Sequence, residues 1–148
     1  MSEGPTRVNF YLLSTAGEQA RMHTACRVVD KAWQRGLKVW VWAEDSDDLQ
    51  SMDDLLWTFR QDSFVPHETI ARSEPQGEPP APVLLSVEAS DPACTDILIN
   101  LSGKLPERES LPPRIAEFVG PEADARALGR DRFRGYRDMH CELTTHEL

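Results

Sequence analysis

Short apolar runs alternate along this chain with stretches in which apolar residues recur every three or four positions. The runs predict β-strands at 8–13, 38–43, 83–87, 96–101 and 114–119. Because most of these runs are apolar at successive positions, they are typical of strands buried on both faces of a parallel sheet. Residues 17–35 and 121–139 have side chains of one kind at helical spacing, which predicts a helix in each range. Asp and Ser side chains that can cap a helix predict shorter helical segments between 45 and 59.

Strands that alternate with helices predict an α/β fold, a mostly parallel sheet of about five strands covered by helices on both faces. The length of 148 residues fits a single domain, residues 1–148. The Pro-rich segment 73–82 is expected to be a surface loop, since too little chain follows it for a second domain. The first strand-to-helix turn, residues 14–17 (STAG), has one glycine and no Lys-Ser/Thr pair. We therefore expect no functional nucleotide site there and no cofactor.

The chain is acidic, with 25 Asp and Glu residues against 16 Lys and Arg residues and a net charge of -9. This balance argues against direct nucleic-acid binding, which depends on broad neutralisation of phosphates. Cys26, Cys94 and Cys141 are odd in number and have no paired spacing, which favours free thiols in a reducing compartment. The first residues lack a signal pattern, and no apolar run approaches the ~18 residues of a membrane span. We expect a soluble cytoplasmic protein.

A basic segment stands out against this acidic background. Five arginines lie within twelve residues: Arg126, Arg130, Arg132, Arg134 and Arg137. In a helix over 121–139, positions 126, 130, 133, 134 and 137 share one face, which carries four guanidinium groups and the ring of Phe133. Such a face predicts a site for a defined anion, such as a carboxylate-bearing peptide or a phosphate. The alternative is a solvated helix with ion-pair partners on the same helix: Asp124, Asp131 and Asp138.

Other side chains are candidates for metal or nucleophilic chemistry, and an ordinary structural role competes with each. An acidic cluster after the second strand is placed to bind a divalent cation in a nucleotide- or metal-dependent hydrolase: Asp45, Asp47, Asp48, Asp53 and Asp54. Helix caps and a solvated face are the simpler account of this cluster. His140, Cys141 and His146 lack the spacing of metal ligands and fit a polar tail, and Cys26 fits a core position.

Two large aromatic residues, Trp57 and Phe64, flank a helix end that Pro66 terminates. Rings in such a position either pack into the core or form an exposed patch that anchors another protein. Spacing alone leaves both readings open.

Several sequence blocks together resemble the chi subunit of the bacterial DNA polymerase III holoenzyme. They are FYLL, AC-x-x-V-x-KAW-x-x-G, VWVWAED, LLWTFRQDSFVPH, DILINLSG, RDRFRGYRD and ELTTHEL. The blocks follow the family order from residue 9 to the end, so the resemblance covers nearly the whole chain. It implies a Rossmann-like α/β domain, three layers deep, that has no catalytic activity and no working nucleotide site.

The resemblance also implies partners. Chi-family proteins connect the clamp loader, through the psi subunit, to the acidic C-terminal tail of single-stranded-DNA-binding protein (SSB). Carried over by position, the tail site comprises five residues: Val119, Arg126, Arg130, Phe133 and Arg134. The psi surface centres on Trp57 and Phe64, which relatives also offer to a DNA-repair helicase. Direct single-stranded nucleic-acid binding through the arginine helix, or hydrolysis at the acidic cluster, is the alternative function.

This sequence departs from the family pattern in the arginine helix. Position 133 is usually tyrosine in relatives and is phenylalanine here, so a hydroxyl contact is missing. Gly135 lies inside the predicted helix and is expected to weaken it by ~1 kcal/mol relative to alanine.

Overall fold

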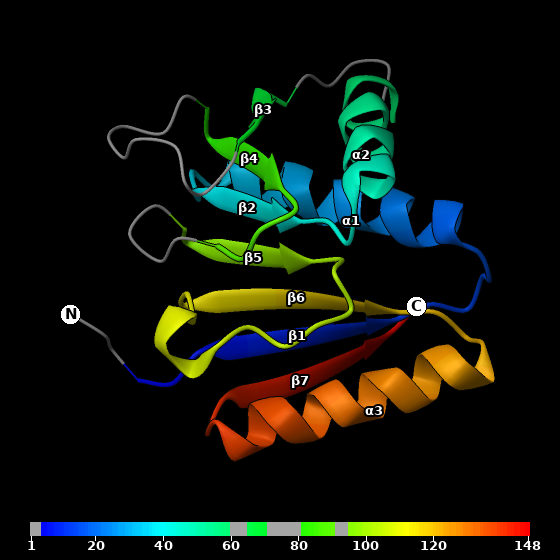
Figure 1. Cartoon of the computed structure of the whole chain (residues 1–148), viewed down its shortest axis with the longest axis vertical. Coiled ribbons are helices and arrows are strands. Elements are labelled where there is room, and N and C mark those ends of the chain that lie inside the picture. Colours follow the sequence, from blue (N-terminus) through cyan, green and yellow to red (C-terminus); the bar gives the residue numbers. More distant parts are fainter. Residues whose placement is uncertain (1–3, 60–64, 71–80, 91–94) are drawn as a thin grey trace.

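A computed structural model of the chain describes residues 4–59, 65–70, 81–90 and 95–148 (Figure 1). Its described part holds one sheet of seven strands. The strands are β1 Arg7–Leu12, β2 Val39–Trp42, β3 His67–Thr69, β4 Val83–Ser86, β5 Ile97–Asn100, β6 Arg114–Val119 and β7 Glu142–Glu147. The helices are α1 Glu18–Gln34, α2 Ser46–Thr58, α3 Ala123–Asp138 and the single 3-10 turn η2 Arg108–Ser110.

The sheet has the strand order β3-β4-β2-β5-β6-β1-β7, and every pairing in it is parallel. The predicted α/β fold with a parallel sheet is therefore confirmed. Strands β2, β4 and β5 are buried at all four positions, which explains why each reads as a continuous apolar run.

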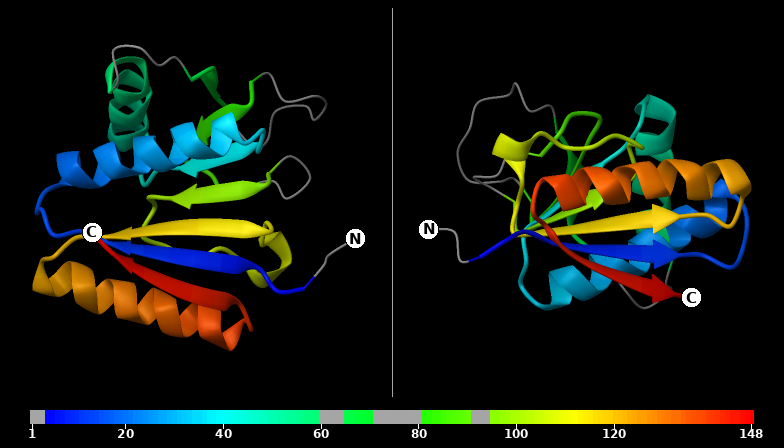
Figure 2. Two further views of the ribbon diagram at one scale, coloured as in Figure 1. Left: turned by 180° about the vertical axis from the view of Figure 1, so that it is seen from behind. Right: turned by 90° about the horizontal axis from the view of Figure 1, so that it is seen from below.

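Helices cover the two faces of the sheet unequally (Figure 2). Helices α1 and α2 pack on one face, where their apolar residues meet inward side chains of β2, β4, β5 and β6. Helix α3 packs on the opposite face, near β6, β1 and β7. The core on the α3 side includes the buried rings of Trp40, Phe10 and Tyr136. On the α1 side, no helix of the described chain lies over β7, and this part of the sheet face is open (Figure 2).

The predicted number of about five strands was wrong, because β3 and β7 carry little apolar signal. Strand β3 has three residues, two of them exposed. Strand β7 is an edge strand with the sequence ELTTHE, and four of its six residues are exposed. The C-terminal residues that resembled a polar tail are therefore part of the sheet. His140, at φ 64°, makes the turn that joins α3 to β7.

The segment after β2 forms one helix rather than the predicted short segments. Asp45 caps α2, because its Oδ1 accepts a hydrogen bond from the Asp48 backbone N–H at 2.9 Å. Met52 and Leu56, one helical turn apart, bury themselves in the core on the same side of the helix. A single capped helix with one apolar stripe follows from these residues.

Candidate peptide-binding site on helix α3

Helix α3 approaches the sheet closely at Gly129. A Cβ atom at this position would lie 3.0 Å from both γ-methyl groups of Val119 on β6. Glycine therefore lets the helix backbone lie against the end of the strand. Gly135, expected to weaken the helix, faces the side chain of Leu105, and a Cβ there would collide with it. The helix spans nearly the whole predicted range and contains both glycines.

A pocket of about 350 Å³ opens between α3 and the C-terminal ends of β1, β6 and β7. We call it the α3 pocket; its lining residues are Phe10, Leu12, Val119, Arg126, Gly129, Arg130, Phe133 and Thr145. Four of the five residues assigned to an SSB-tail site by resemblance lie in this lining, and Arg134 does not. Sequence reasoning missed Phe10, Leu12 and Thr145, because they reach the pocket only through the parallel pairing of the strands. It also missed Gly129, which lies on α3 against Val119.

Arg126 is held in place at the edge of the α3 pocket by two backbone carbonyl groups. Its Nε donates to Gly120 O at 3.0 Å, and one terminal nitrogen donates to Leu13 O at 3.4 Å. These carbonyls come from the loops that follow β6 and β1. Among the described residues, no carboxylate forms an ion pair with Arg126. The remaining N–H groups are oriented and available to an anion.

Arg130 and Phe133 supply the other two kinds of contact. Arg130 is exposed, and within the described chain it has no ion-pair or side-chain hydrogen-bond partner. The ring of Phe133 is half-buried and packs against Phe10 with ring centroids 5.4 Å apart. An exposed cation, a fixed cation and an apolar wall thus surround one pocket. This combination suits a ligand with both carboxylates and an apolar side chain.

Arg134 agrees with the alternative interpretation of this helix, in which an arginine pairs with an aspartate of the same helix in solvent. It forms an ion pair with Asp131 three residues before it, and both side chains are more than half exposed. Such a surface pair contributes ~0–1 kcal/mol to stability. In the described part of the chain, Asp131 is the only one of the three predicted aspartate partners that pairs with an arginine of α3.

Arg132 points into the protein instead. Its Nε donates to Oε1 of Glu117 on β6 at 2.9 Å, and the two side chains are 12% and 1% exposed. Asn100, the register partner of Glu117 on β5, donates to the other carboxylate oxygen at 2.7 Å, and Tyr136 of α3 donates to the same oxygen. Asn100 Oδ1 in turn accepts from Ser102. This buried network joins α3 to the centre of the sheet.

The network was missed from the sequence, although a signal for it exists. Glu117 interrupts the apolar run 114–119 at a position where the strand is buried on both faces. A carboxylate in such a strand requires a partner, and Arg132 is the only arginine of the basic segment outside the predicted face. Burial raises the pKa of Glu117, and the Arg132 charge with the Tyr136 and Asn100 hydrogen bonds opposes that rise. Burial and the Glu117 charge raise the pKa of Tyr136.

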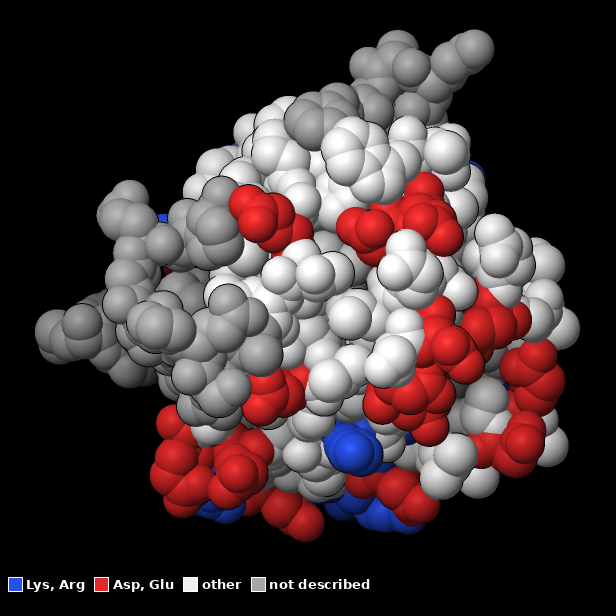
Figure 3. Space-filling view, turned by 45° about the horizontal axis from the view of Figure 1, so that its top comes forward, with Lys and Arg blue, Asp and Glu red and all other residues white. Residues whose placement is uncertain are grey.

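The acidic cluster after β2 does not form a metal centre. Asp45 is the cap of α2, and the Gln50 side chain donates to Asp54 at 3.0 Å. Burial, followed by neighbouring carboxylates, raises the pKa of Asp48. Across the described residues no group of three or more His, Cys, Asp or Glu side chains is placed to hold a metal ion. Figure 3 shows acidic side chains spread over the face of the molecule that carries α2, with few cations among them.

Trp57 lies on the surface at the end of α2. Its side chain is 54% exposed, and its ring packs against the ring of His67 on β3, with ring centroids 5.0 Å apart. His67 is buried beneath it, with Nε2 at 3.0 Å from Asp53 Oδ1. An aromatic ring that remains half in solvent is available to a partner protein. Phe64, the other residue of the predicted patch, lies outside the described residues.

The N-terminus of α1, where an α/β protein would hold a phosphate, faces a carboxylate of its own chain. Gly17, at φ 107°, is the N-cap residue of α1, and its N–H donates to Oε2 of Glu122 at 3.2 Å. A phosphate at this position would meet a like charge. Of the candidate metal ligands, His146 has its Nε2 2.8 Å from Asn9 Oδ1. Cys26, the candidate nucleophile, is buried in the core. Cys94 lies outside the described residues. None of the described helices is long and apolar enough to cross a bilayer.

The sequence of this chain matches a known family over nearly all of its length. The model of the family described as DNA polymerase III chi subunit, HolC, matches residues 6–144. A Pseudomonas aeruginosa protein named DNA polymerase III subunit chi is 36% identical over 143 residues, which is 97% of each chain. Proteins of the same name from Escherichia coli and Haemophilus influenzae are 29% and 24% identical and cover 92% and 94% of this chain, and 94% and 95% of their own lengths.

A solved structure has the same fold. The crystal structure of T4 UvsW superimposes with a TM-score of 0.68 and covers 97% of this chain and 41% of the UvsW chain. The sequence identity is 9%, so this likeness shows the fold alone.

Proposed function

The chain belongs to the DNA polymerase III chi-subunit family, and we propose that it binds the acidic C-terminal tail of SSB in the α3 pocket. Membership of this family makes it a non-catalytic accessory subunit of the polymerase, with a role in DNA replication. The finer function is that of an adaptor, which tethers the replicative polymerase to SSB-coated single-stranded DNA.

The convergence of Val119, Arg126, Arg130 and Phe133 on one pocket is the observation that supports this proposal. An SSB tail ends in acidic residues, an aromatic residue and a free carboxylate. The oriented N–H groups of Arg126 and the unpaired guanidinium of Arg130 would receive carboxylates in charge-assisted hydrogen bonds. Phe133 and Val119 would pack against the aromatic ring. Arg134 does not line the pocket and is paired with Asp131. It would bind the tail only if its ion pair with Asp131 were broken.

The expected affinity of one tail is modest. A pocket of about 350 Å³ accommodates only the last few residues of a peptide. Contacts of this size bind with dissociation constants in roughly the micromolar range. SSB is oligomeric and presents several tails on one DNA strand, so a high local concentration would compensate for weak single contacts.

The exposed Trp57 is the proposed anchor for a second partner, the psi subunit of the clamp loader or a DNA-repair helicase. It lies at the end of α2, whereas the α3 pocket lies on the opposite face of the sheet. Two partners on opposite faces would bind without competing, which an adaptor requires.

Binding of an SSB C-terminal peptide to purified variants tests the tail site. Arg130→Ala should weaken binding at least about tenfold, since the loss of a charged hydrogen bond costs ~1.5–3 kcal/mol. Arg137→Ala is the matched control, because Arg137 is exposed on the same helix and does not line the pocket. Equal affinities of the two variants in calorimetry would refute the assignment.

A further inference from the structure

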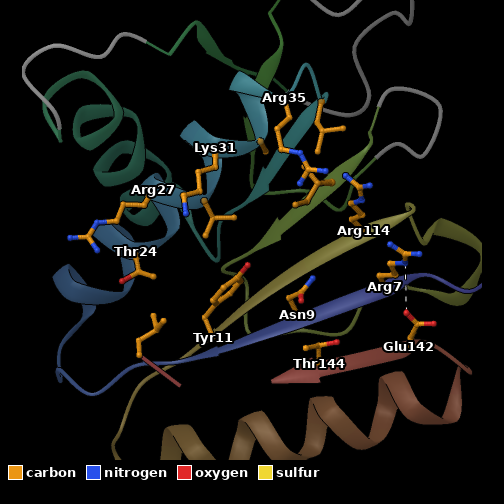
Figure 4. Close-up of a pocket in the computed structure, with 15 residues that line it drawn as sticks. Arg7, Asn9, Tyr11, Thr24, Arg27, Lys31, Arg35, Arg114, Glu142 and Thr144 are labelled. Carbon is orange, nitrogen blue, oxygen red and sulfur yellow. Dashed lines mark ion pairs between the residues drawn. The ribbon is translucent and has the colours of Figure 1, made fainter. Parts of the chain in front are cut away.

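A second basic site lies on the opposite face of the sheet from the α3 pocket (Figure 4). An open groove of about 570 Å³ runs between α1 and the part of the sheet face that no helix covers. We call it the α1 groove. Its charged and polar lining consists of Arg7, Asn9, Thr24, Arg27, Lys31, Arg35, Arg114, Glu142 and Thr144.

Five cations surround this groove. Arg27, Lys31 and Arg35 extend along α1 and its C-cap at every fourth residue, while Arg7 and Arg114 come from the first residues of β1 and β6 (Figure 4). Figure 4 shows the strand arginines at the same end of the groove as Arg35.

Within the part of the chain that the structure describes, these cations have few acidic partners. One carboxylate side chain there lines the groove, that of Glu142, whose Oε1 lies 3.7 Å from Nε of Arg7. Arg27, Lys31, Arg35 and Arg114 have no ion pair or side-chain hydrogen bond with any described residue.

Arg27 and Lys31, and Lys31 and Arg35, are like charges four residues apart along α1 and its C-cap, so each pair repels. The chain as a whole has a net charge of -9, so its composition offers enough carboxylates to neutralise these positions. A concentration of free cations in a concave surface of an acidic protein is the electrostatic signature of an anion site.

We propose that the α1 groove binds an extended acidic peptide with carboxylates at every second residue. Four residues of an α-helix rise about 6 Å, and two residues of an extended strand rise about 6.6 Å. Arg27, Lys31 and Arg35 therefore match the side-chain spacing of a peptide that lies along α1. The lining also includes the apolar side chains of Val28, Leu37 and Ile97, which suit uncharged side chains of such a peptide.

A single nucleic-acid strand fits the groove less well. Sites for single strands combine cations with aromatic rings on which bases stack. Tyr11 is the one aromatic residue in the lining that the structure describes. Its ring is stacked between Phe118 at 5.4 Å and His146 at 4.9 Å, because all three occupy the same register position on adjacent strands. Neither face of the ring is left for a base.

Fluorescence anisotropy with a labelled hexapeptide of alternating Asp and Val tests this proposal. The wild-type chain should bind it saturably, and Lys31→Glu should weaken binding at least about tenfold, because it places a protein carboxylate opposite a carboxylate of the peptide. Lys31→Gln should have a smaller effect in the same direction. Arg137→Glu, on α3 and outside the linings of both the groove and the α3 pocket, is the matched control and should bind as the wild type does. Arg130→Glu reports separately whether the peptide enters the α3 pocket. Unfolding temperatures of all variants check that the fold is intact.

Three results would overturn the proposal. Loss of peptide binding in Arg130→Glu but not in Lys31→Glu would place the hexapeptide in the α3 pocket. Equal affinity for a hexapeptide with three Asp followed by three Val would remove the spacing argument. Tighter binding of an oligothymidylate, also lost in Lys31→Glu, would make the groove a nucleic-acid site. None of these results tests the SSB-tail assignment, which is tested separately by the binding of an SSB C-terminal peptide to Arg130→Ala.

Discussion

Replacement of Arg132 by alanine should destabilise this protein more than any other single arginine truncation on α3. The change leaves the Glu117 carboxylate buried at 1% exposure without its cationic partner, and only Asn100 and Tyr136 still donate to it. Breaking a buried ion pair from one side costs about 3–5 kcal/mol. The Arg132 side chain is 12% exposed, so water can partly replace it, and we expect the lower end, about 3 kcal/mol.

Urea unfolding followed by circular dichroism measures this loss. The thermal unfolding midpoint of a domain of this size falls by about 2–4 °C for each kcal/mol of lost stability. The midpoint of thermal unfolding should therefore also fall, by about 6–12 °C. Arg134→Ala is the matched control, because Arg134 is two residues away on the same helix but its pair with Asp131 is exposed. The control should change stability by less than about 1 kcal/mol.

The cost of Arg132→Ala should depend on pH. Burial raises the folded-state pKa of Glu117, and the Arg132 charge is the largest influence that lowers it. Without Arg132 that pKa rises further above the unfolded value. A group with a raised folded-state pKa contributes its full stability below the unfolded pKa and loses it as the pH rises through the folded pKa. The variant should therefore be least destabilised in acid, where Glu117 is protonated, and increasingly destabilised toward neutral and alkaline pH.

A loss below about 1 kcal/mol at neutral pH, or a loss that grows on acidification, would refute this reasoning. The first result would mean that the Glu117 carboxylate is neutral or solvated in the native state. The second would mean that Glu117 does not control the pH dependence of the loss.

Three further predictions concern other parts of the chain. Asp45→Ala should cost about 1 kcal/mol in urea unfolding by removing the cap of α2; an unchanged midpoint would contradict the cap. Trp57→Ala should leave the midpoint within about 1 kcal/mol but abolish capture of the psi subunit, and unimpaired capture would exclude the patch. Burial raises the pKa of Cys26 to about 12, so iodoacetamide should not label it in the native protein at neutral pH. Rapid labelling of Cys26, detected by mass spectrometry, would contradict its burial.

The elements whose side chains are apolar at successive positions could be predicted from the sequence. Strands β2, β4 and β5 are buried on both faces, so their residues alone identify them. Strand β7 could not be found in this way. It is an edge strand whose stability comes from backbone pairing with β1, and its polar side chains carry no sign of that pairing.

Some residues of the α3 pocket could likewise be predicted from the sequence, and others could not. Helical spacing placed Arg126, Arg130 and Phe133 on one face, and the structure brings them to one pocket. Spacing could not separate Arg134, which pairs with Asp131, from the arginines that remain free. The pocket also needs Thr145 of β7, which reaches it only because β7 pairs with β1. Such contacts depend on sheet order, which local sequence does not encode.

The central claim is that the α3 pocket links this polymerase subunit to SSB-coated DNA through the SSB tail. Fluorescence anisotropy of the labelled chain on oligonucleotide coated with full-length SSB, or with SSB that lacks its C-terminal residues, tests it most directly. We predict association with the full-length coat, none with the truncated coat, and negligible affinity for the bare strand, since the net charge of -9 opposes phosphate binding. Equal association with both coats, or tight binding to bare DNA, would contradict the account.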